Sequence, residues 1–311
     1  MVPVSRVLRR RAFDAYAANL SLYHPHVRDQ FLCPMCRKLF GLDALEVADP
    51  EVTVAHVVPQ AAGGRAWTLT CKRCNNEIGS RYDSHLVEEH RFAQWRRGER
   101  PLPARLRSGT SEIGVEIDRS DAGWTFHEIE KQTDPAQSSA FFERLQKCND
   151  FRFTATTRTF SIRARRTALI YSAFLMMFRM FGYEYVLLPE AEQTLRALHG
   201  EADPDELRAA VIVVDRDARR EPASLPSVSL LVKPAEFRCF AVTLAEPQDQ
   251  NAVRVVALKG FGPGGQDCHR RILASDGNLG RCEAKEIEAV QLESLAHPKS
   301  KWYAHRLWRH L

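Results

Sequence analysis

Several familiar sequence features are missing from this chain of 311 residues, and each absence removes a class of protein. The longest nearly apolar run, residues 168–178, has 11 residues, whereas a helix that crosses a bilayer needs about 20. The first residues are basic, but no apolar stretch of signal-peptide length follows them. We therefore expect a soluble protein that makes no contact with a membrane and stays in the cytoplasm.

The chain also lacks internal repeats, low-complexity linkers and the motifs of several enzyme classes. It contains no P-loop, no glycine-rich dinucleotide fingerprint and no Ser-His-Asp signature. A hydrophobic content of 44% and a charged content of 27% are ordinary for a globular protein and exclude a mainly disordered chain. Because domains commonly hold about 100–200 residues, the length predicts two domains.

The formal net charge is +5, and the excess of positive charge lies in the first third of the chain. Residues 1–105 contain 16 Lys and Arg against 11 Asp and Glu, whereas residues 106–311 contain 28 of each. This asymmetry favours a polyanionic partner for the first third. A basic surface that faces only solvent would give the same counts, so charge alone does not choose between the two.

Hydrophobic periodicity and turn residues predict an α+β fold. We expect a first domain over residues 1–105 and a second α+β domain over 106–311, for which recognition of a substrate or effector is the natural role. The helices that we expect span 6–23, 75–97 (with Gly79 as an unfavourable residue), 136–148 and 165–181. The strands that we expect span 51–58, 67–70, 112–118, 123–130, 151–160, 184–188, 210–215, 227–233, 237–244 and 253–258.

Four of the eight cysteines form two C-x2-C pairs, Cys33 with Cys36 and Cys71 with Cys74. Each pair can fold as a tight turn that presents two sulfur atoms on one side, and two such turns complete a tetrahedral Zn²⁺ site. In a reducing compartment, zinc explains clustered thiols better than disulfides do. Two pairs of buried thiols could also coincide by chance. Because four cysteines leave no open position on the metal, this zinc should hold the fold and do no chemistry.

The chain from the first pair through the second follows the order strand, glycine-containing loop, strand and helix, with His56 at the end of the first strand and Asn75, directly after Cys74, at the start of the helix. This pattern resembles the HNH endonucleases, also called ββα-metal or His-Me finger endonucleases, in the form clipped by a C-x2-C pair on either side. The resemblance covers about residues 30–90. It is carried by Cys33-x2-Cys36, Ala55-His56-x2-Pro59, Gly63-Gly64, Leu69, Cys71-x2-Cys74-Asn75, Gly79-Ser80 and Asp83.

The resemblance implies hydrolysis of DNA phosphodiester bonds, with His56 as the general base and Asn75 as a ligand of a catalytic Mg²⁺ or Mn²⁺. These roles suit the side chains, because a neutral imidazole accepts a proton near neutral pH and an amide oxygen is an acceptable ligand for Mg²⁺. Two plainer alternatives stay open. His56 could be an ordinary buried histidine, and Asn75 could merely cap its helix.

The sequence departs from the family pattern at two positions. Ala55 stands where the family usually has an acid or a second histidine that binds the metal, and it offers no side-chain ligand. Thr68 lies near the position of the family's middle asparagine, whose usual role is to orient the loop that carries the histidine. Threonine could do this only in part.

A substitute metal ligand is therefore expected, and Asp83 is our candidate, with Asn76 and Glu77 as alternatives. Asp83 follows Asn75 by eight residues. On a straight helix the two would share a face but lie about 12 Å apart along the axis. A break at Gly79 could bring Asp83 back towards Asn75.

Basic residues flank the predicted finger, and we expect Arg73, Arg96 and Arg97 to contact DNA phosphates, which position a duplex without reading its sequence. The dipole of the helix also favours cations near its end, which is an adequate reason for one or two of them. The expected setting is restriction, phage defence or mobile-element DNA processing, and a homo-oligomer is compatible with the sequence. The alternative is a non-catalytic zinc-containing module that binds nucleic acid or another protein.

Overall fold

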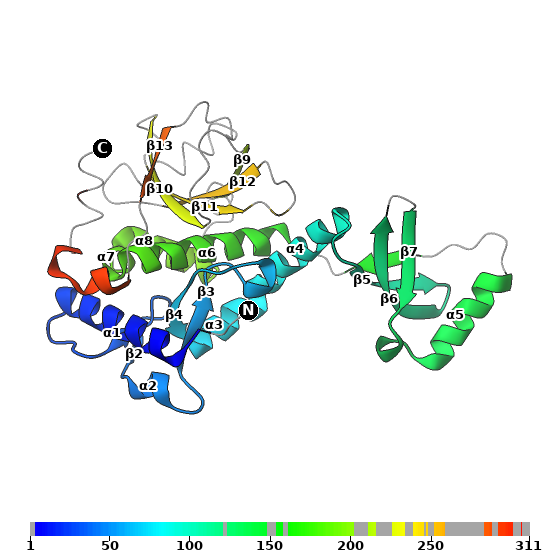
Figure 1. The fold of residues 1–311 in the computed structure, drawn as a ribbon, viewed down its shortest axis with the longest axis horizontal. Helices are drawn as coiled ribbons and strands as arrows, with labels where there is room; N and C mark the ends of the chain where they lie inside the picture. Colours follow the sequence, from blue (N-terminus) through cyan, green and yellow to red (C-terminus); the bar gives the residue numbers. More distant parts are fainter. Residues whose placement is uncertain are drawn as a thin grey trace. The chain divides into compact units, whose positions relative to one another are not determined.

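The structure, a computed structural model, divides by its internal contacts into two units (Figure 1). The first unit joins residues 1–84 to residues 162–311, and the second comprises residues 85–161. This division departs from the boundary expected near residue 105, because helices after residue 161 pack against the first third of the chain. The residues described are 4–120, 123–147, 154–157, 161–201, 211–215, 226–233, 239–245, 247, 252–258, 283–287, 292–300 and 306.

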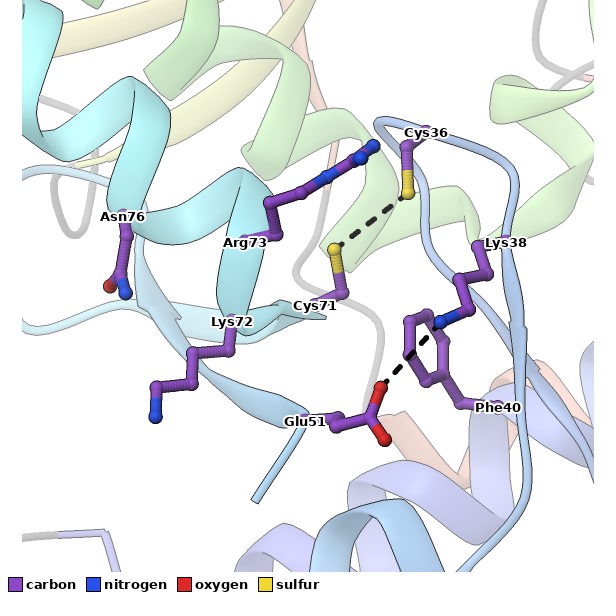
Figure 2. Close-up of a pocket in the computed structure, with 8 residues that line it drawn as sticks. All are labelled: Cys36, Lys38, Phe40, Glu51, Cys71, Lys72, Arg73 and Asn76. Carbon is purple, nitrogen blue, oxygen red and sulfur yellow. Dashed lines mark hydrogen bonds and ion pairs between the residues drawn. The ribbon is translucent and has the colours of Figure 1, made fainter. Parts of the chain in front are cut away.

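The first unit begins with a helix and a small set of strands that carry the cysteine pairs. Helix α1 spans Arg6–Tyr23, as its hydrophobic spacing predicts. Short strands β1 (Phe31–Leu32) and β2 (Leu39–Phe40) form a hairpin whose connection contains the first pair, and helix α2 (Asp43–Glu46) follows. The second pair begins at the end of strand β4, where Figure 2 shows the sulfur of Cys71 facing that of Cys36.

Strands β3 (Val52–His56) and β4 (Trp67–Cys71) form the antiparallel hairpin that the sequence predicts, joined through a 3-10 turn, η1 (Gln60–Ala62). The helical segment after β4 begins earlier than expected and is less regular. Helix α3 spans Lys72–Ile78, a π-helical turn, η2, spans Gly79–Asp83, and helix α4 (Ser84–Arg96) follows along the chain. The glycine expected to weaken one long helix therefore begins a wider turn, a feature that is frequent at functional sites.

Helix α6 (Ile162–Phe181) forms much of the core of the first unit. It contacts β4 and also strands β11 (Cys239–Ala245) and β12 (Ala252–Leu258), and Figure 1 shows it between the finger and the C-terminal sheet. The rings of Phe178 and Tyr16 stack with centroids 4.4 Å apart. Packing on two sides explains why apolar side chains cover nearly all of this helix.

The strand predicted over residues 184–188 is wrong. These residues lie in helix α7 (Tyr183–Val186) and in the turn before helix α8 (Pro189–Leu198). All four residues of α7 are buried, and the Tyr183 hydroxyl donates to Leu32 O at 2.6 Å and accepts from Leu32 N at 2.9 Å. Tertiary packing here outweighs the β propensity of aromatic and branched side chains.

The remaining described strands of the first unit form one antiparallel sheet in the order β13-β10-β11-β12-β9. Strands β9 (Val211–Asp215) and β10 (Ser227–Lys233), with β11 and β12, match predicted strands, whereas β13 (Glu283–Ile287) was not predicted. Two 3-10 turns, η5 (Leu292–Ala296) and η6 (Pro298–Ser300), follow. Asn19 of α1 donates through Nδ2 to Leu295 O at 2.9 Å, which ties η5 to the first helix.

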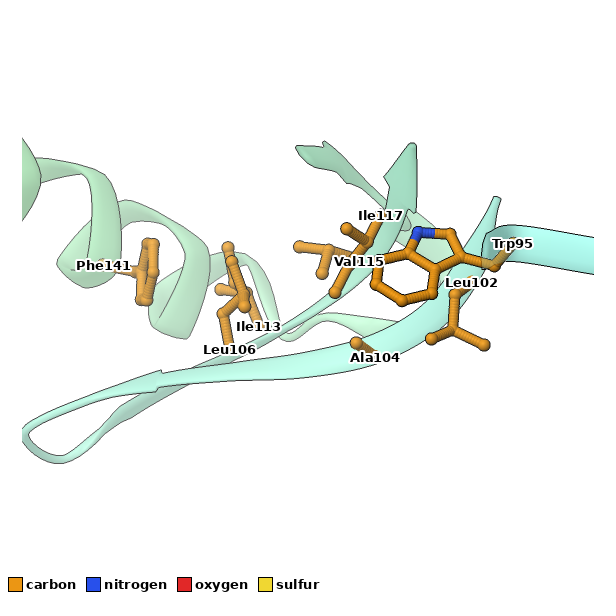
Figure 3. Packing of buried hydrophobic residues seen from close by; sticks show 8 residues of the cluster. All are labelled: Trp95, Leu102, Ala104, Leu106, Ile113, Val115, Ile117 and Phe141. Carbon is orange, nitrogen blue, oxygen red and sulfur yellow. The ribbon is translucent and has the colours of Figure 1, made fainter. Parts of the chain in front are cut away.

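The second unit contains a four-stranded antiparallel sheet in the order β7-β6-β5-β8. The strands are β5 (Leu102–Ser108), β6 (Ser111–Ser120), β7 (Gly123–Glu128) and β8 (Thr154–Thr157), and the helical elements are η3 (Glu130–Gln132) and α5 (Pro135–Lys147). Figure 3 shows its core, in which Trp95 and Phe141 pack with apolar side chains of β5 and β6. Residues 151–153 and 158–160 of the predicted strand over 151–160 lie outside the described residues.

The two ends of the second unit meet, because Ser161 N donates to His85 Nδ1 at 3.1 Å. Among the helices that the structure describes, none combines the length and apolar character that a bilayer crossing requires.

Candidate functional site

The four predicted zinc ligands form one cluster. The sulfur atoms of Cys33, Cys36, Cys71 and Cys74 all lie within 4.8 Å of one another. A tetrahedral zinc site with Zn–S bonds of about 2.3 Å has S···S edges of about 3.8 Å. The Cys36 and Cys71 sulfurs are 3.7 Å apart (Figure 2), so the spacing of this pair fits the edge of such a tetrahedron.

Local backbone structure directs these sulfurs towards one point. In the first turn, Cys33 N donates to Lys38 O at 2.9 Å, and Arg37 N donates to Cys33 O at 3.0 Å. Arg37 adopts a left-handed conformation, φ 59°, and its side chain reaches Val186 O at 2.5 Å and Glu192 at 3.3 Å. The turn is thus anchored to α7 and α8.

The second cysteine pair is held by the start of α3. Cys71 is the N-cap of this helix, and its sulfur accepts a hydrogen bond from Cys74 N at 3.4 Å. Cys33 Sγ likewise accepts from Cys71 N at 3.4 Å. With the backbone hydrogen bond from Lys38 to Cys36, backbone N–H groups face three of the four sulfurs, an arrangement that stabilises thiolates.

The four thiols cannot all ionise without a cation. Hydrogen bonds from Cys33 and Cys74 lower the pKa of Cys71 to about 2, whereas hydrogen bonds with Cys36 and the other neighbours, together with burial, raise the pKa of Cys33 well above its usual range. Like charges this close oppose one another, and a divalent ion relieves the conflict. The donor set and its geometry therefore fit a closed structural Zn²⁺ site.

A second site is an open pocket of about 470 Å³ beside the end of β3. It is formed by β3, η1, α3 and η2, so it lies within the ββα segment. His56, Asn75 and Asp83, which the sequence nominates separately, all line it. The complete lining is Val54, His56, Pro59, Gln60, Ala61, Asn75, Asn76, Gly79, Ser80 and Asp83.

His56 is the last residue of β3 and lies opposite Trp67 in the ladder. Its side chain is half-buried, and this burial lowers the pKa of the imidazole below its usual value of about 6.5. Among the described residues, no hydrogen-bond partner occupies its ring nitrogens. The imidazole is therefore neutral near pH 7, open to the pocket and able to accept a proton.

Asn75 connects α3 to β3. Its Nδ2 donates to Val54 O at 3.1 Å and to Thr53 Oγ1 at 3.3 Å. A backbone carbonyl can only accept, which fixes the orientation of the amide and leaves Oδ1 as the atom free to bind a cation. The alternative that Asn75 caps the helix is excluded, because Cys71 holds the N-cap position.

Asp83 reaches the same pocket through the π-helical turn. A Cβ atom at Gly79 would lie 3.5 Å from Asp83 Oδ2, so the carboxylate lies close to the start of that turn. Burial raises the pKa of Asp83 to about 6. Among the described residues the carboxylate has no ion-pair partner. A half-buried carboxylate and an amide oxygen that line the same pocket are a donor set that fits a hard divalent ion such as Mg²⁺ or Mn²⁺.

Residues 33–91 match a family model described as HNH endonuclease. The match covers less than a fifth of the chain and includes all four cysteines of the cluster together with His56, Asn75 and Asp83. It confirms the resemblance to HNH endonucleases that the sequence shows in this segment. No curated protein and no solved structure matches the chain.

The two departures from the HNH pattern face away from the pocket. Ala55 lies opposite Thr68 in the β3–β4 ladder, and neither side chain is more than 1% exposed. The Thr68 hydroxyl is 2.6 Å from the Tyr16 hydroxyl, in the interior. Because successive side chains of a strand point to opposite faces, Ala55 and Thr68 face the core while His56 faces the pocket. The task expected of the middle asparagine therefore does not fall to Thr68.

The alternative metal ligands and the arginines expected to contact DNA lie in different parts of the molecule. Asn76 lines the pocket, whereas Glu77 is 3.9 Å from Arg73, an exposed side chain next to the cluster (Figure 2). Arg96 and Arg97 are exposed and lie in the second unit. Arg97 is bound to Glu99 by two hydrogen bonds, of 2.5 Å and 3.0 Å, so much of its charge is already neutralised.

Proposed function

We propose that this protein is an endonuclease that hydrolyses phosphodiester bonds of DNA. The observation that carries the proposal is the convergence of His56, Asn75 and Asp83 on one open pocket within the segment that matches HNH endonucleases. Metal-assisted phosphodiester hydrolysis requires a base for the attacking water and ligands that hold a divalent cation, and an imidazole, an amide oxygen and a carboxylate can supply both.

Each of these three residues has its own role in the proposed hydrolysis. His56, neutral near pH 7, accepts the proton of the attacking water. Asn75 Oδ1 and the Asp83 carboxylate hold Mg²⁺ or Mn²⁺, and Asn75 Nδ2 keeps β3 in place beside them. When bound, the cation stabilises negative charge on the phosphate and on the departing oxygen.

The remaining parts of the molecule bind and orient. The cysteine cluster, with structural Zn²⁺, fixes the two turns that frame the hairpin. Arg73, Arg96 and Arg97 contact the phosphate backbone, and the described residues after 105 contribute to recognition of a substrate or effector. The biological setting that suits such an enzyme is restriction, phage defence or mobile-element DNA processing.

The test is nicking of a supercoiled plasmid by zinc-loaded protein, with and without added Mg²⁺ or Mn²⁺. The His56→Ala variant should nick about 10²–10⁴-fold more slowly than wild type, because it lacks the general base. Its zinc content, melting temperature and DNA affinity should stay near wild type. The matched control is His26→Ala, which removes an exposed imidazole outside the pocket and should leave nicking unchanged.

Equal nicking by wild type and His56→Ala, under every metal condition, would remove the catalytic proposal. If the wild-type protein binds DNA but does not cleave it, the result would favour the non-catalytic module, in which Ala55 marks a lost metal ligand.

A further inference from the structure

Some carbonyl groups of the β3–β4 hairpin near His56 point away from the partner strand, and those of Val54 and Trp67 accept hydrogen bonds from side chains outside the hairpin. Val57 N donates to Ala66 O at 2.9 Å, so these residues form a hydrogen-bonded pair. Such pairs alternate along an antiparallel ladder, which makes the neighbouring pair, His56 with Trp67, one without cross-strand hydrogen bonds. The Trp67 carbonyl therefore points outwards from the hairpin, and by the same alternation so does that of Val54.

Side chains from two helices bind these two carbonyls. Asn75 Nδ2 of α3 donates to Val54 O at 3.1 Å, and Arg179 Nη1 of α6 donates to Trp67 O at 2.5 Å. The guanidinium carbon of Arg179 also lies 6.0 Å from the centre of the Trp67 ring, within the range of a cation–π interaction. The end of the hairpin that carries His56 is thus held at both outer edges.

Arg179 lies far outside the HNH-matching segment, residues 33–91, yet it acts on that segment. Thr68, the neighbour of Trp67, directs its hydroxyl to Tyr16 in the core and supplies nothing to the His56 face. A hydrogen bond from a charged donor is stronger than one between neutral groups, and removing the donor would leave a half-buried carbonyl unpaired. Arg179 is therefore well placed to fix the position of Trp67.

We propose that Arg179 is a positioning residue for His56. It holds Trp67, and through the ladder it holds the strand end that carries the imidazole. The proposal rests on the proposed endonuclease function, because the consequence of a displaced His56 is slower proton transfer. A displacement of about 1 Å in a catalytic group can lower a rate by about 10²-fold without removing any group that touches the substrate.

The test compares three variants of the full-length, zinc-loaded protein. Arg179→Met keeps an unbranched side chain of similar bulk but has no donor, Arg179→Lys restores a charged donor, and Arg163→Met removes an exposed arginine from the same helix as a control. In plasmid nicking, Arg179→Met should lower kcat by about 10–100-fold with KM and zinc content unchanged. Arg179→Lys should recover part of this loss, and Arg163→Met should behave as wild type.

Two results in that assay would overturn the proposal. One is an unchanged kcat in Arg179→Met. The other is a fall in kcat that merely follows the fraction of unfolded protein, in both Arg179→Met and Arg179→Lys, since that would show a purely structural role.

A second readout does not depend on cleavage. The NMR signals of the His56 imidazole, assigned by their loss in His56→Gln, should shift or broaden in Arg179→Met and stay in place in Arg163→Met. If wild type fails to nick DNA but these signals respond as expected, the proposed function fails while the positioning role of Arg179 stands. Unchanged His56 signals in folded Arg179→Met would overturn that role, whatever the nicking assay shows.

Discussion

The cysteine cluster and the open pocket share the β3–β4 hairpin and the short helix α3, yet the cluster encloses its polar groups and the pocket exposes them. Cys74 and Asn75 are adjacent residues of α3. Cys74 is 3% exposed and points into a closed group of four sulfurs, whereas Asn75 lines a pocket open to solvent. One helical turn therefore serves both a site that is complete without a substrate and a site that leaves room for one.

This difference is the one expected between a site that stabilises a fold and a site that acts on another molecule. Four thiolates saturate a tetrahedral ion, so the cluster can contribute folding free energy but has no position for a reactant. The pocket holds a base without a ring partner among the described residues and a carboxylate whose pKa burial raises. Titratable groups that are partly buried and lack a partner are typical of functional sites, and such groups often lower the stability of the fold.

The largest effect that we expect comes from opening the cluster. Cys71→Ser should remove Zn²⁺ and unfold the first unit, because this residue is both a proposed zinc ligand and the N-cap of α3. Zinc binding contributes about 10–16 kcal/mol to folding in small zinc-finger peptides, so a fall in melting temperature of roughly 10 °C or more is expected. Metal analysis and thermal melting measure both effects.

The control for this change is Cys239→Ser, at a buried cysteine of β11 outside the cluster. It should keep one zinc ion per chain. Folded Cys71→Ser protein with a wild-type melting temperature would contradict the structural role of the cluster.

A smaller effect is expected from a change in the pocket, and it should raise the stability of the protein where Cys71→Ser lowers it. Asp83→Asn should raise the Mg²⁺ or Mn²⁺ concentration needed for nicking by at least about tenfold. Because the folded state raises the pKa of Asp83 to about 6, the stability that the protonated acid confers is lost as pH rises through that value. At pH 7.5, without added Mg²⁺ or Mn²⁺, Asp83→Asn should therefore melt a few degrees higher than wild type, by about 2–4 °C per kcal/mol.

Asn75 provides the matched comparison for Asp83. Asn75→Asp keeps an oxygen ligand but removes the amide that donates to Val54 O, so it should lower stability where Asp83→Asn raises it. If Asp83→Asn changes neither the metal requirement nor the melting temperature, Asp83 is a surface acid and the pocket lacks its second ligand.

The smallest effects should come from the arginines. Arg73→Ala and Arg96→Ala should each weaken DNA binding only a few-fold at low salt. Each should also reduce the slope of log affinity against log salt concentration by about one, the loss of one phosphate contact. Arg97→Ala should do less, because Glu99 already neutralises that side chain. Binding titrations at several salt concentrations measure this, and an affinity that ignores ionic strength would contradict phosphate contacts altogether.

Local patterns predict the parts of the site that local physics determines. The spacing of the cysteines, the β-branched run of β3 and the apolar periodicity of α1 and α6 all appear in the structure where the sequence places them. His56 and Asn75 could be nominated because their positions, between the cysteine pairs and directly after the second pair, follow a known motif. The cluster and the base therefore need only short-range information.

Long-range contacts determine the parts that could not be predicted. The approach of Asp83 to the pocket depends on a π-helical turn, which a glycine suggests but does not specify. Arg179 contacts Trp67 across more than a hundred residues, and no local pattern marks it as different from the other arginines of α6. Strand β5 was not predicted, because Pro103 interrupts its sequence. Proline has no N–H to donate, and the strand tolerates it because β8 pairs with β5 only from Ala104 onwards.

The first unit is assembled from two stretches of chain with residues 85–161 between them, and this sets an order of events during synthesis. Chains emerge from the ribosome N-terminal end first, and their domains fold as they appear. All four cysteines of the cluster emerge before the second unit does, whereas Arg179 and the partners of Arg37 emerge only after it. The cluster of a nascent chain can therefore form early, while the strand end that carries His56 still lacks one of its two supports. Both supports of that strand end would be in place only after residue 179 has emerged.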